Sequence, residues 1–453
     1  MKKFISILIS SVIFLSSSAY AENISPDFWA YSQVSEAKND GWFDENLKTG
    51  DYALKSTAEL ALSFVFKNSY PASVDTDEYI TRGELAEELY KFLPRDDSVL
   101  EISFSDIASS NYSYSIQKCA NAGLLNGYSD GTFKPDNPVT NAELAVIISN
   151  LKKNRAEAVE IYNKVNEKYK NLKSFTIDLN SDTDITVNFS GDNEETIKTV
   201  STGSLKTIVN DFSDFDIEMS GILDISMGQI SQKTNLYYKD NTYYIDTNDL
   251  KIKTEMDFNE LMSDMGLNYS DIGEGLGLDE SSFILGYVKK NDDGTKDLYA
   301  EIDIDSIMQN SPNFMNIDYD FGNFSTIIHI DENYNITSYD AYYDMKMGYD
   351  SNNSYIVYSM EANYRLRDLD STVVDVPDDL DSYSDIEGFV IGGDDGDDFV
   401  VKDEDFFIDD GENGIYDFFI YNKGGIEDLV IDSETKNNDA DTPAYIGPAG
   451  IIS

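Results

Sequence analysis

Residues Phe104–Leu151 read FSDIASSNYSYSIQKCANAGLLNGYSDGTFKPDNPVTNAELAVIISNL, and this stretch decides the fold. Its apolar spacing predicts a helix over about Tyr112–Ala122. The residues expected near one face of that helix are Tyr114, Ile116, Cys119, Ala120 and Leu124. Gly123 follows where a helix C-terminus favours a residue with positive φ. The first half of the stretch therefore predicts a short amphipathic helix with a glycine stop.

The second half of the stretch predicts a loop and a second helix. Residues 127–135 (GYSDGTFKP) are rich in turn-forming residue types. Thr140–Glu143 then fits a capping box, in which the Thr hydroxyl accepts from the amide three residues on and the Glu side chain reaches back. The whole stretch is thus a helix–loop–helix unit.

This unit resembles a surface-layer homology (SLH) module. The resemblance rests on the FSD start, the GLLNGYSDGTFKPD loop and the TxAE helix start, which occur in order and at the family's spacing. It implies a helix–loop–helix repeat that holds bacterial proteins on cell-wall polysaccharide.

Earlier residues predict further repeats of the same kind. WAYxxVxxAxxxGWF, from Trp29, resembles the first helix of an SLH module, and two more capping-box patterns occur at Ser56–Glu59 and Thr81–Glu84. The expected SLH region is 22–152, composed of a divergent repeat (about 25–70), a truncated repeat (74–94) and a full repeat (103–152). An unrelated helical bundle with Thr caps is the alternative.

The N-terminus predicts export. Lys2 and Lys3 precede an apolar run over Phe4–Leu15, and Ala19–Ala21 forms a small-x-small cleavage signal. Residues 1–21 therefore predict a signal peptide, which is too short for a stable membrane span. We expect a secreted protein of a Gram-positive cell surface, with no lipid anchor and no transmembrane segment in its mature form.

Composition excludes several functions. The chain has 33 basic and 85 acidic residues, for a formal charge of -52, so binding to nucleic acid is not expected. The single cysteine, Cys119, excludes an internal disulfide, and the single histidine, His329, excludes a His-based zinc site. Cys119 is expected to lie in a core, and His329 is expected to be either structural or solvent-facing.

The pattern changes after the SLH region. Residues 153–376 predict a helix over about Arg155–Leu172 followed by an antiparallel β domain, because apolar and polar residues alternate. The strand segments are Ser174–Leu179, Asp184–Phe189, Asp216–Met219, Leu236–Tyr238, Thr242–Asp246, Ile302–Ile304, Ser325–Ile330 and Tyr355–Tyr364. Turns are expected at Lys239–Asn241 and Asp292–Gly294.

In its order of one helix followed by many antiparallel strands, this region resembles the half-barrel of lipoprotein-carrier proteins. In those proteins a curved sheet wraps an apolar face. Leu261–Leu278 is a candidate covering segment, and a generic all-β domain is the alternative. The expected fold class is therefore α+β and multidomain. After it, residues 377–453 are strongly acidic and predict a largely disordered tail.

Candidate site residues follow from the SLH resemblance. In that family the Arg of a Thr-Arg-Ala-Glu helix start meets the carboxylate of a pyruvylated sugar, since a guanidinium donates two parallel hydrogen bonds. Arg82 matches that position, with Thr81 and Glu84 beside it, while Asn141 and Thr57 replace the Arg in the other two repeats. The expected polysaccharide-binding residues are Thr81, Arg82, Glu84, Trp29, Tyr128, Thr140 and Glu143. The aromatic residues Trp29, Trp42 and Tyr128 either stack on sugars or pack internally.

Metal and catalytic motifs are weak by comparison. Asp394–Asp398 superficially matches part of a Ca²⁺ loop, but a solvated acidic run is the better interpretation. With 85 acidic residues, a pair of carboxylates occurs by chance and is no evidence for a glycosidase. The chain also lacks GxSxG, HExxH and P-loop motifs. We therefore expect no enzyme, no metal site and no cofactor.

The combined prediction is a non-catalytic surface protein. SLH repeats would anchor it to secondary cell-wall polysaccharide in the S-layer or cell wall, and the β domain would be displayed. One alternative is a hydrophobic-ligand or lipid carrier on the cell envelope, with a small apolar ligand in the β domain. Another is a polysaccharide-processing enzyme with an SLH anchor.

Overall fold

The computed structural model describes residues 24–44, 46–66, 78–95, 103–169, 172–189, 193–211, 216–228, 230–247, 250–255, 282–303, 318–349 and 354–385. The predicted signal peptide, the candidate covering segment Leu261–Leu278 and the Asp394–Asp398 run lie outside these ranges. The chain divides into two compact units. The first contains the helices up to Asn163 together with Asp279–Asp303 and Ser325–Ile327; the second contains the rest.

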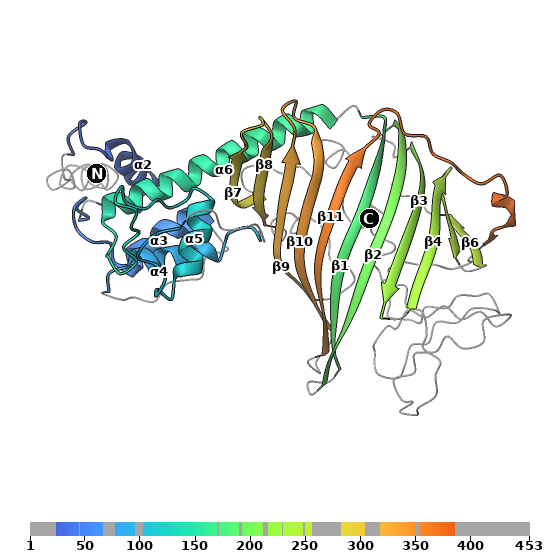
Figure 1. The fold of residues 1–453 in the computed structure, drawn as a ribbon, viewed down its shortest axis with the longest axis horizontal. Coiled ribbons are helices and arrows are strands. Elements are labelled where there is room, and N and C mark those ends of the chain that lie inside the picture. Colours follow the sequence, from blue (N-terminus) through green and yellow to red (C-terminus); the bar gives the residue numbers. More distant parts are fainter. Residues whose placement is uncertain are drawn as a thin grey trace, which may run out of the picture. The chain divides into compact units, whose positions relative to one another are not determined.

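Figure 1 shows the helices of the described residues. They are α2 (Tyr31–Asp40), α3 (Lys55–Phe66), α4 (Arg82–Tyr90), α5 (Ser113–Asn121) and α6 (Asn141–Tyr169). Gly123, with φ 70°, follows α5 in the left-handed region, as predicted, and Gly41, with φ 92°, ends α2 in the same way. The glycine stops thus act where the sequence places them.

A ring of backbone hydrogen bonds joins the segments that enter α3, α4 and α6. The Ala53 amide donates to the Val139 carbonyl (2.8 Å), the Val139 amide to the Ile80 carbonyl (3.0 Å) and the Ile80 amide to the Ala53 carbonyl (3.0 Å). All three side chains are buried. Three β-bridges surround them: Tyr52 with Thr140, Leu54 with Tyr79 and Thr81 with Pro138. The three helix starts are therefore equivalent positions around a pseudo-threefold centre.

One helix replaces the two that the sequence suggested near residue 152. α6 runs unbroken for 29 residues, so the helix expected over Arg155–Leu172 is its C-terminal half. No Gly or Pro interrupts Asn141–Tyr169, and the helical pattern continues across the expected boundary. Within the first unit, Ala158 of α6 packs on Gly286, where a Cβ would lie 2.8 Å from the Ala158 Cβ.

The strands form one mostly antiparallel sheet. They are β1 (Ser174–Phe189), β2 (Asn193–Asp211), β3 (Asp216–Met227), β4 (Ile230–Lys239), β5 (Thr242–Thr247), β6 (Leu250–Glu255), β7 (Phe283–Lys290), β8 (Lys296–Ile302), β9 (Asp318–Ile330), β10 (Ile336–Tyr349), β11 (Ser354–Arg367) and β12 (Ser384–Asp385). The 12-stranded sheet has the order β12-β6-β5-β4-β3-β2-β1-β11-β10-β9-β8-β7. The expected combination of helices with a large antiparallel sheet is confirmed.

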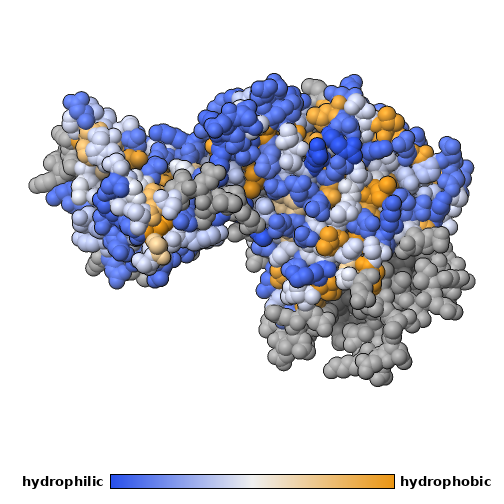
Figure 2. Space-filling model, in the orientation of Figure 1, coloured by the Kyte–Doolittle hydropathy of each residue, from blue (hydrophilic) through white to orange (hydrophobic). Residues whose placement is uncertain are grey.

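Cross-strand register separates an apolar face from a polar face in the second unit. One row of partners on the apolar face runs through Leu366, Ile177, Leu205, Gly221, Leu236, Ile245 and Ile252. The parallel row on the opposite face runs through Arg367, Thr176, Lys206, Ser220, Tyr237, Tyr244 and Lys253. Successive strand residues point to opposite faces, so this alternation is sustained across seven strands. On the side shown in Figure 2, hydrophobic positions are scattered among hydrophilic ones.

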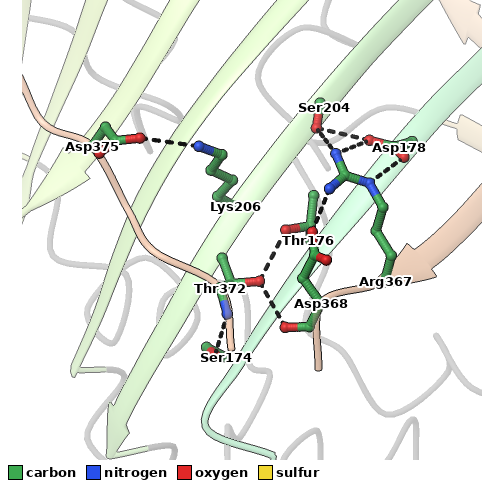
Figure 3. A network of polar contacts seen from close by, with 9 residues as sticks. All are labelled: Ser174, Thr176, Asp178, Ser204, Lys206, Arg367, Asp368, Thr372 and Asp375. Atoms are coloured by element: carbon green, nitrogen blue, oxygen red, sulfur yellow. Dashed lines mark hydrogen bonds and ion pairs between the residues drawn. The ribbon is translucent and has the colours of Figure 1, made fainter. Parts of the chain in front are cut away.

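Residues 368–385 cross the polar face as a strap. The Thr372 amide donates to Ser174 Oγ (3.1 Å), its hydroxyl lies 2.9 Å from that of Thr176, and Lys206 Nζ reaches Asp375 Oδ2 at 3.1 Å (Figure 3). At the far end, Tyr383 is buried edge-on to Tyr244, with ring centroids 5.4 Å apart. The described start of the predicted acidic tail, residues 377–385, is therefore packed on the sheet.

Other local predictions need correction. α3 begins at Lys55, so Ser56 is inside the first turn and is not the N-cap of a capping box. Tyr114 is exposed, whereas Ile116, Cys119, Ala120 and Leu124 are buried as expected. The first two strand segments are parts of the single strand β1, and β8 ends at Ile302. The turns are confirmed: Asp240 and Asn241 have φ 50° and 56°, and Gly294 has φ 89°.

Candidate functional site

The candidate site is built on the first residues of the three equivalent helices. Each of these residues follows the backbone ring by two positions: Lys55 in α3, Arg82 in α4 and Asn141 in α6. The Arg82 amide donates to the Asn137 carbonyl (2.9 Å), and the Asn141 amide donates to the Asp51 carbonyl (2.9 Å). Each helix start is therefore fastened to the loop that precedes a different helix.

Arg82 lies against the loop of residues 126–135. Its Nε donates to the Phe133 carbonyl (2.9 Å) and its Nη2 to the Asn126 carbonyl (2.6 Å). The guanidinium carbon lies 4.5 Å from the ring centroid of Phe133 and 4.9 Å from that of Tyr128. Only 8% of Arg82 is exposed. Two of the three guanidinium nitrogens thus hold the loop, and Tyr128, a predicted site residue, lies directly beside the cation.

Asp106 holds the same loop from the other side. Its Oδ1 accepts from the Phe133 amide (2.8 Å) and its Oδ2 accepts from the Lys134 amide (2.7 Å). Burial acts to raise the pKa of the carboxyl, but these hydrogen bonds to the charged form outweigh it and keep the pKa below its ordinary value. Asp106 is the acidic residue of the FSD start, so this motif has a direct structural role.

The loop carries an accessible cation. Lys134 Nζ lies 4.1 Å from the Tyr128 ring centroid and 3.7 Å from Asp130 Oδ2. The backbone of Lys134 has φ 59°, a conformation that costs energy for a residue other than glycine, and Asp106 holds its amide. The loop therefore presents Tyr128 and Lys134 together on a fixed backbone.

Asn141 occupies the place of Arg82 at the third helix start. It is buried, and its Nδ2 donates to the Lys48 carbonyl (2.9 Å). The Asn amide therefore repeats the loop-holding contact of Arg82 without its charge. The structure therefore places Asn141 at the position that the helix-start motif predicts for it.

Lys55 is the first residue of α3 and is equivalent to Arg82 and Asn141, and the sequence motifs do not predict it as a site residue. The capping-box pattern at Ser56–Glu59 predicts Thr57 at this position, but the backbone ring and the start of α3 place Lys55 there. Its Nζ lies 3.0 Å from Glu78 Oε2 and 2.8 Å from Glu84 Oε1, and these bonds raise the pKa of Lys55. Two of the three helix starts therefore carry a cation.

The other predicted polar residues form caps. Thr81 and Glu84 make a reciprocal capping box at α4. Thr140 and Glu143 do the same at α6, where the Thr140 amide donates to Glu143 Oε2 (2.8 Å) and the Glu143 amide donates to Thr140 Oγ1 (3.3 Å). Burial acts to raise the pKa of Glu84, but the bonds from Lys55 and Thr81 lower it overall. These carboxylates order the starts of α4 and α6.

The remaining residues that the sequence singled out differ in how far their side chains are exposed to solvent. Trp29 is 63% exposed and contacts Phe28, whereas Trp42 is buried and is a packing residue. Cys119 is buried, as expected, and its thiol donates to the Ala86 carbonyl (3.3 Å). His329 Nε2 lies 3.1 Å from Asp340 Oδ2 in a cross-strand pair. In the part of the chain that the structure describes, no helix is both long and apolar enough to cross a membrane.

Comparison with known proteins identifies one segment of the helical unit, residues 103–145. A family model described as the S-layer homology domain matches residues 103–145, so the chain carries an S-layer homology domain there, as the sequence resemblance predicted. Over 88 residues the chain is 36% identical to Cell surface glycoprotein 1 of Acetivibrio thermocellus. That match covers 18% of this chain and 4% of the relative's length.

Solved structures give weak similarity only. LprF from Mycobacterium bovis is 13% identical with a TM-score of 0.27, over 49% of this chain and 97% of LprF. A LolA superfamily protein from Nitrosomonas europaea is 10% identical with a TM-score of 0.16, over 49% of this chain and 96% of that protein.

Proposed function

We propose that this chain is a non-catalytic surface protein that binds an anionic cell-wall polysaccharide through its helical unit. The observation that carries the proposal is that Lys55 and Arg82 begin two helices joined by one backbone ring, and that Lys134 lies on the loop whose carbonyls Arg82 binds. The S-layer homology domain at 103–145 and the similarity to a cell surface glycoprotein support attachment at the cell wall.

The three cations have different roles: one holds the loop, and two are accessible to the glycan. Arg82 donates hydrogen bonds from its Nε and Nη2 to loop carbonyls, so it positions the loop and Tyr128. Lys55 and Lys134 are more exposed, with 29% and 38% of their side chains accessible, and can reach a glycan carboxylate. A local cation is needed because the whole chain, at -52, repels an anionic polymer.

The test is sedimentation of the full chain with protein-free cell walls at one fixed salt concentration. Lys55→Met keeps the aliphatic stem and removes the charge, and we expect it to weaken wall binding about tenfold, which corresponds to about 1.4 kcal/mol. Lys91→Met is the matched control, since Lys91 is an exposed lysine that also pairs with a glutamate, Glu88.

Removing ketal pyruvate from the walls with mild acid should weaken the unaltered chain in the same way. The proposal fails if the unaltered chain does not sediment with walls. Its assignment of the cation fails if Lys55→Met and Lys91→Met bind alike. Fixed salt matters because ionic strength screens both the local attraction and the repulsion by the whole chain.

A second candidate function rests on the apolar face of the second unit. Its row from Leu366 to Ile252 crosses seven strands, yet Ile177, Leu205 and Leu236 are only half-buried. We propose that this face binds a hydrophobic ligand such as an acyl chain, since an apolar row left partly accessible to water favours an apolar partner.

A fluorescent acyl-chain probe tests this candidate on the full chain. Leu205→Ser should reduce probe binding several-fold, because it puts a hydroxyl in the middle of the row. Ile222→Ser is the control, since Ile222 is exposed and lies on the opposite face of the neighbouring strand β3. A probe that does not bind the unaltered chain would rule the candidate out.

A further inference from the structure

Two exposed tyrosines occupy equivalent places on the pseudo-threefold centre. Tyr52 precedes Ala53 in the backbone ring, Tyr79 precedes Ile80, and Pro138 holds the third equivalent position. Tyr52 is 49% exposed and Tyr79 is 55% exposed. Their rings meet edge to face, with centroids 5.6 Å apart. The helical unit therefore presents a pair of aromatic rings to solvent where its three helix starts converge.

The backbone under this pair is firmly held. Tyr52 forms a β-bridge with Thr140 and Tyr79 forms one with Leu54, and the ring residues that follow them are buried. The backbone at both tyrosines is thus set before any ligand arrives, and their mutual ring contact orders the side chains. Tyrosine loses little conformational entropy when it is immobilised, so a rigid exposed pair is well suited to recognition.

The groups around the pair are polar. Glu78 adjoins Tyr79, accepts from the Lys55 amide through its carbonyl (2.8 Å), and pairs with Lys55 Nζ through its side chain (3.0 Å). Aromatic faces beside hydrogen-bonding side chains match a pyranose ring, which has one face of C–H groups and a rim of hydroxyls. A flat apolar partner would instead remove water from this ion pair without offering it a hydrogen bond.

We propose that Tyr52 and Tyr79 form a stacking subsite for an uncharged sugar ring of the wall polysaccharide. This subsite rests on the proposed wall binding and adds to it a contact that does not depend on the sugar's charge. The subsite lies beside Lys55, so neighbouring sugars of one glycan, one neutral and one anionic, engage the tyrosine pair and the cation together.

The test compares full-chain variants in the same wall-sedimentation assay. The double variant Tyr52→Ser/Tyr79→Ser should lose at least about tenfold in affinity, and Tyr52→Phe/Tyr79→Phe, which keeps both rings, should bind within about twofold of the unaltered chain. Tyr114→Ser is the matched control: Tyr114 is 51% exposed and also meets a second tyrosine, Tyr90, edge to face at 5.4 Å.

Depyruvylated walls separate the subsite from the charged site. Residual binding to such walls should still fall when both tyrosines become serine, and should respond little to Lys55→Met. If the unaltered chain binds walls and the double serine variant binds equally well, the subsite is refuted and the wall binding stands. If the unaltered chain does not bind walls, both proposals are refuted.

Discussion

Arg82→Ala is expected to destabilise the helical unit by about 3 kcal/mol and to lower wall affinity at the same time. The reason is its burial: Arg82 is 8% exposed and donates to the carbonyls of Phe133 and Asn126. Alanine leaves these carbonyls unpaired, and it removes the cation packed on Tyr128 and Phe133. Denaturant unfolding measures the first effect and wall sedimentation the second.

Arg82→Lys separates positioning from charge. A lysine keeps the positive charge but has no planar fork to reach two carbonyls. If Arg82 acts by holding the loop, Arg82→Lys should lose most of the stability and binding that Arg82→Ala loses. Lys91→Ala, which removes an exposed cation of the same helical segment, should change the free energy of unfolding by less than about 0.5 kcal/mol. An Arg82→Ala chain as stable as the unaltered one would contradict this role.

Features fixed by local chemistry were predictable from sequence. The capping boxes at Thr81 and Thr140, the left-handed Gly41 and Gly123, and the hairpin turn at Asp240 each depend on residues close in the chain. The S-layer homology domain was recognisable for the same reason, since its motifs are local and ordered.

Features fixed by distant contacts were not predictable. Ser56–Glu59 has the letters of a capping box, but the bond of the Lys55 amide to the Glu78 carbonyl and the ring through Val139 place the helix start earlier. The missed cation Lys55 follows from that shift. The burial of Arg82 likewise depends on a loop more than 40 residues away, as its separation of 44 from Asn126 shows.

The β region shows the same limit. Strand β2 is rich in Thr, Ser and Lys, so it lacks the apolar signal of a strand, and its pairing with β1 and β3 decides its structure. The acidic composition after Pro377 predicts solvation, yet buried Tyr383 and the Lys251–Asp379 pair (2.7 Å) hold this segment to the sheet. One buried aromatic residue and one ion pair outweigh the average composition there.

Asp106→Asn is expected to destabilise the chain by about 2 kcal/mol at pH 7 and to flatten its response to acid. Asp106 accepts from two amides, and an asparagine would turn an NH₂ group toward one of these donors. The pKa of Asp106 is lowered in the folded chain, so its contribution is complete above the unfolded pKa of about 4 and is lost as the pH falls through the folded value.

Denaturant unfolding of both chains between pH 7 and pH 2 measures this dependence. The difference in unfolding free energy between the unaltered chain and Asp106→Asn should be largest near neutrality and should shrink below about pH 4. Asp136→Asn is the matched control, because Asp136 is an exposed carboxylate of the same loop. A difference that stays constant over this range would mean that the charge of Asp106 contributes nothing.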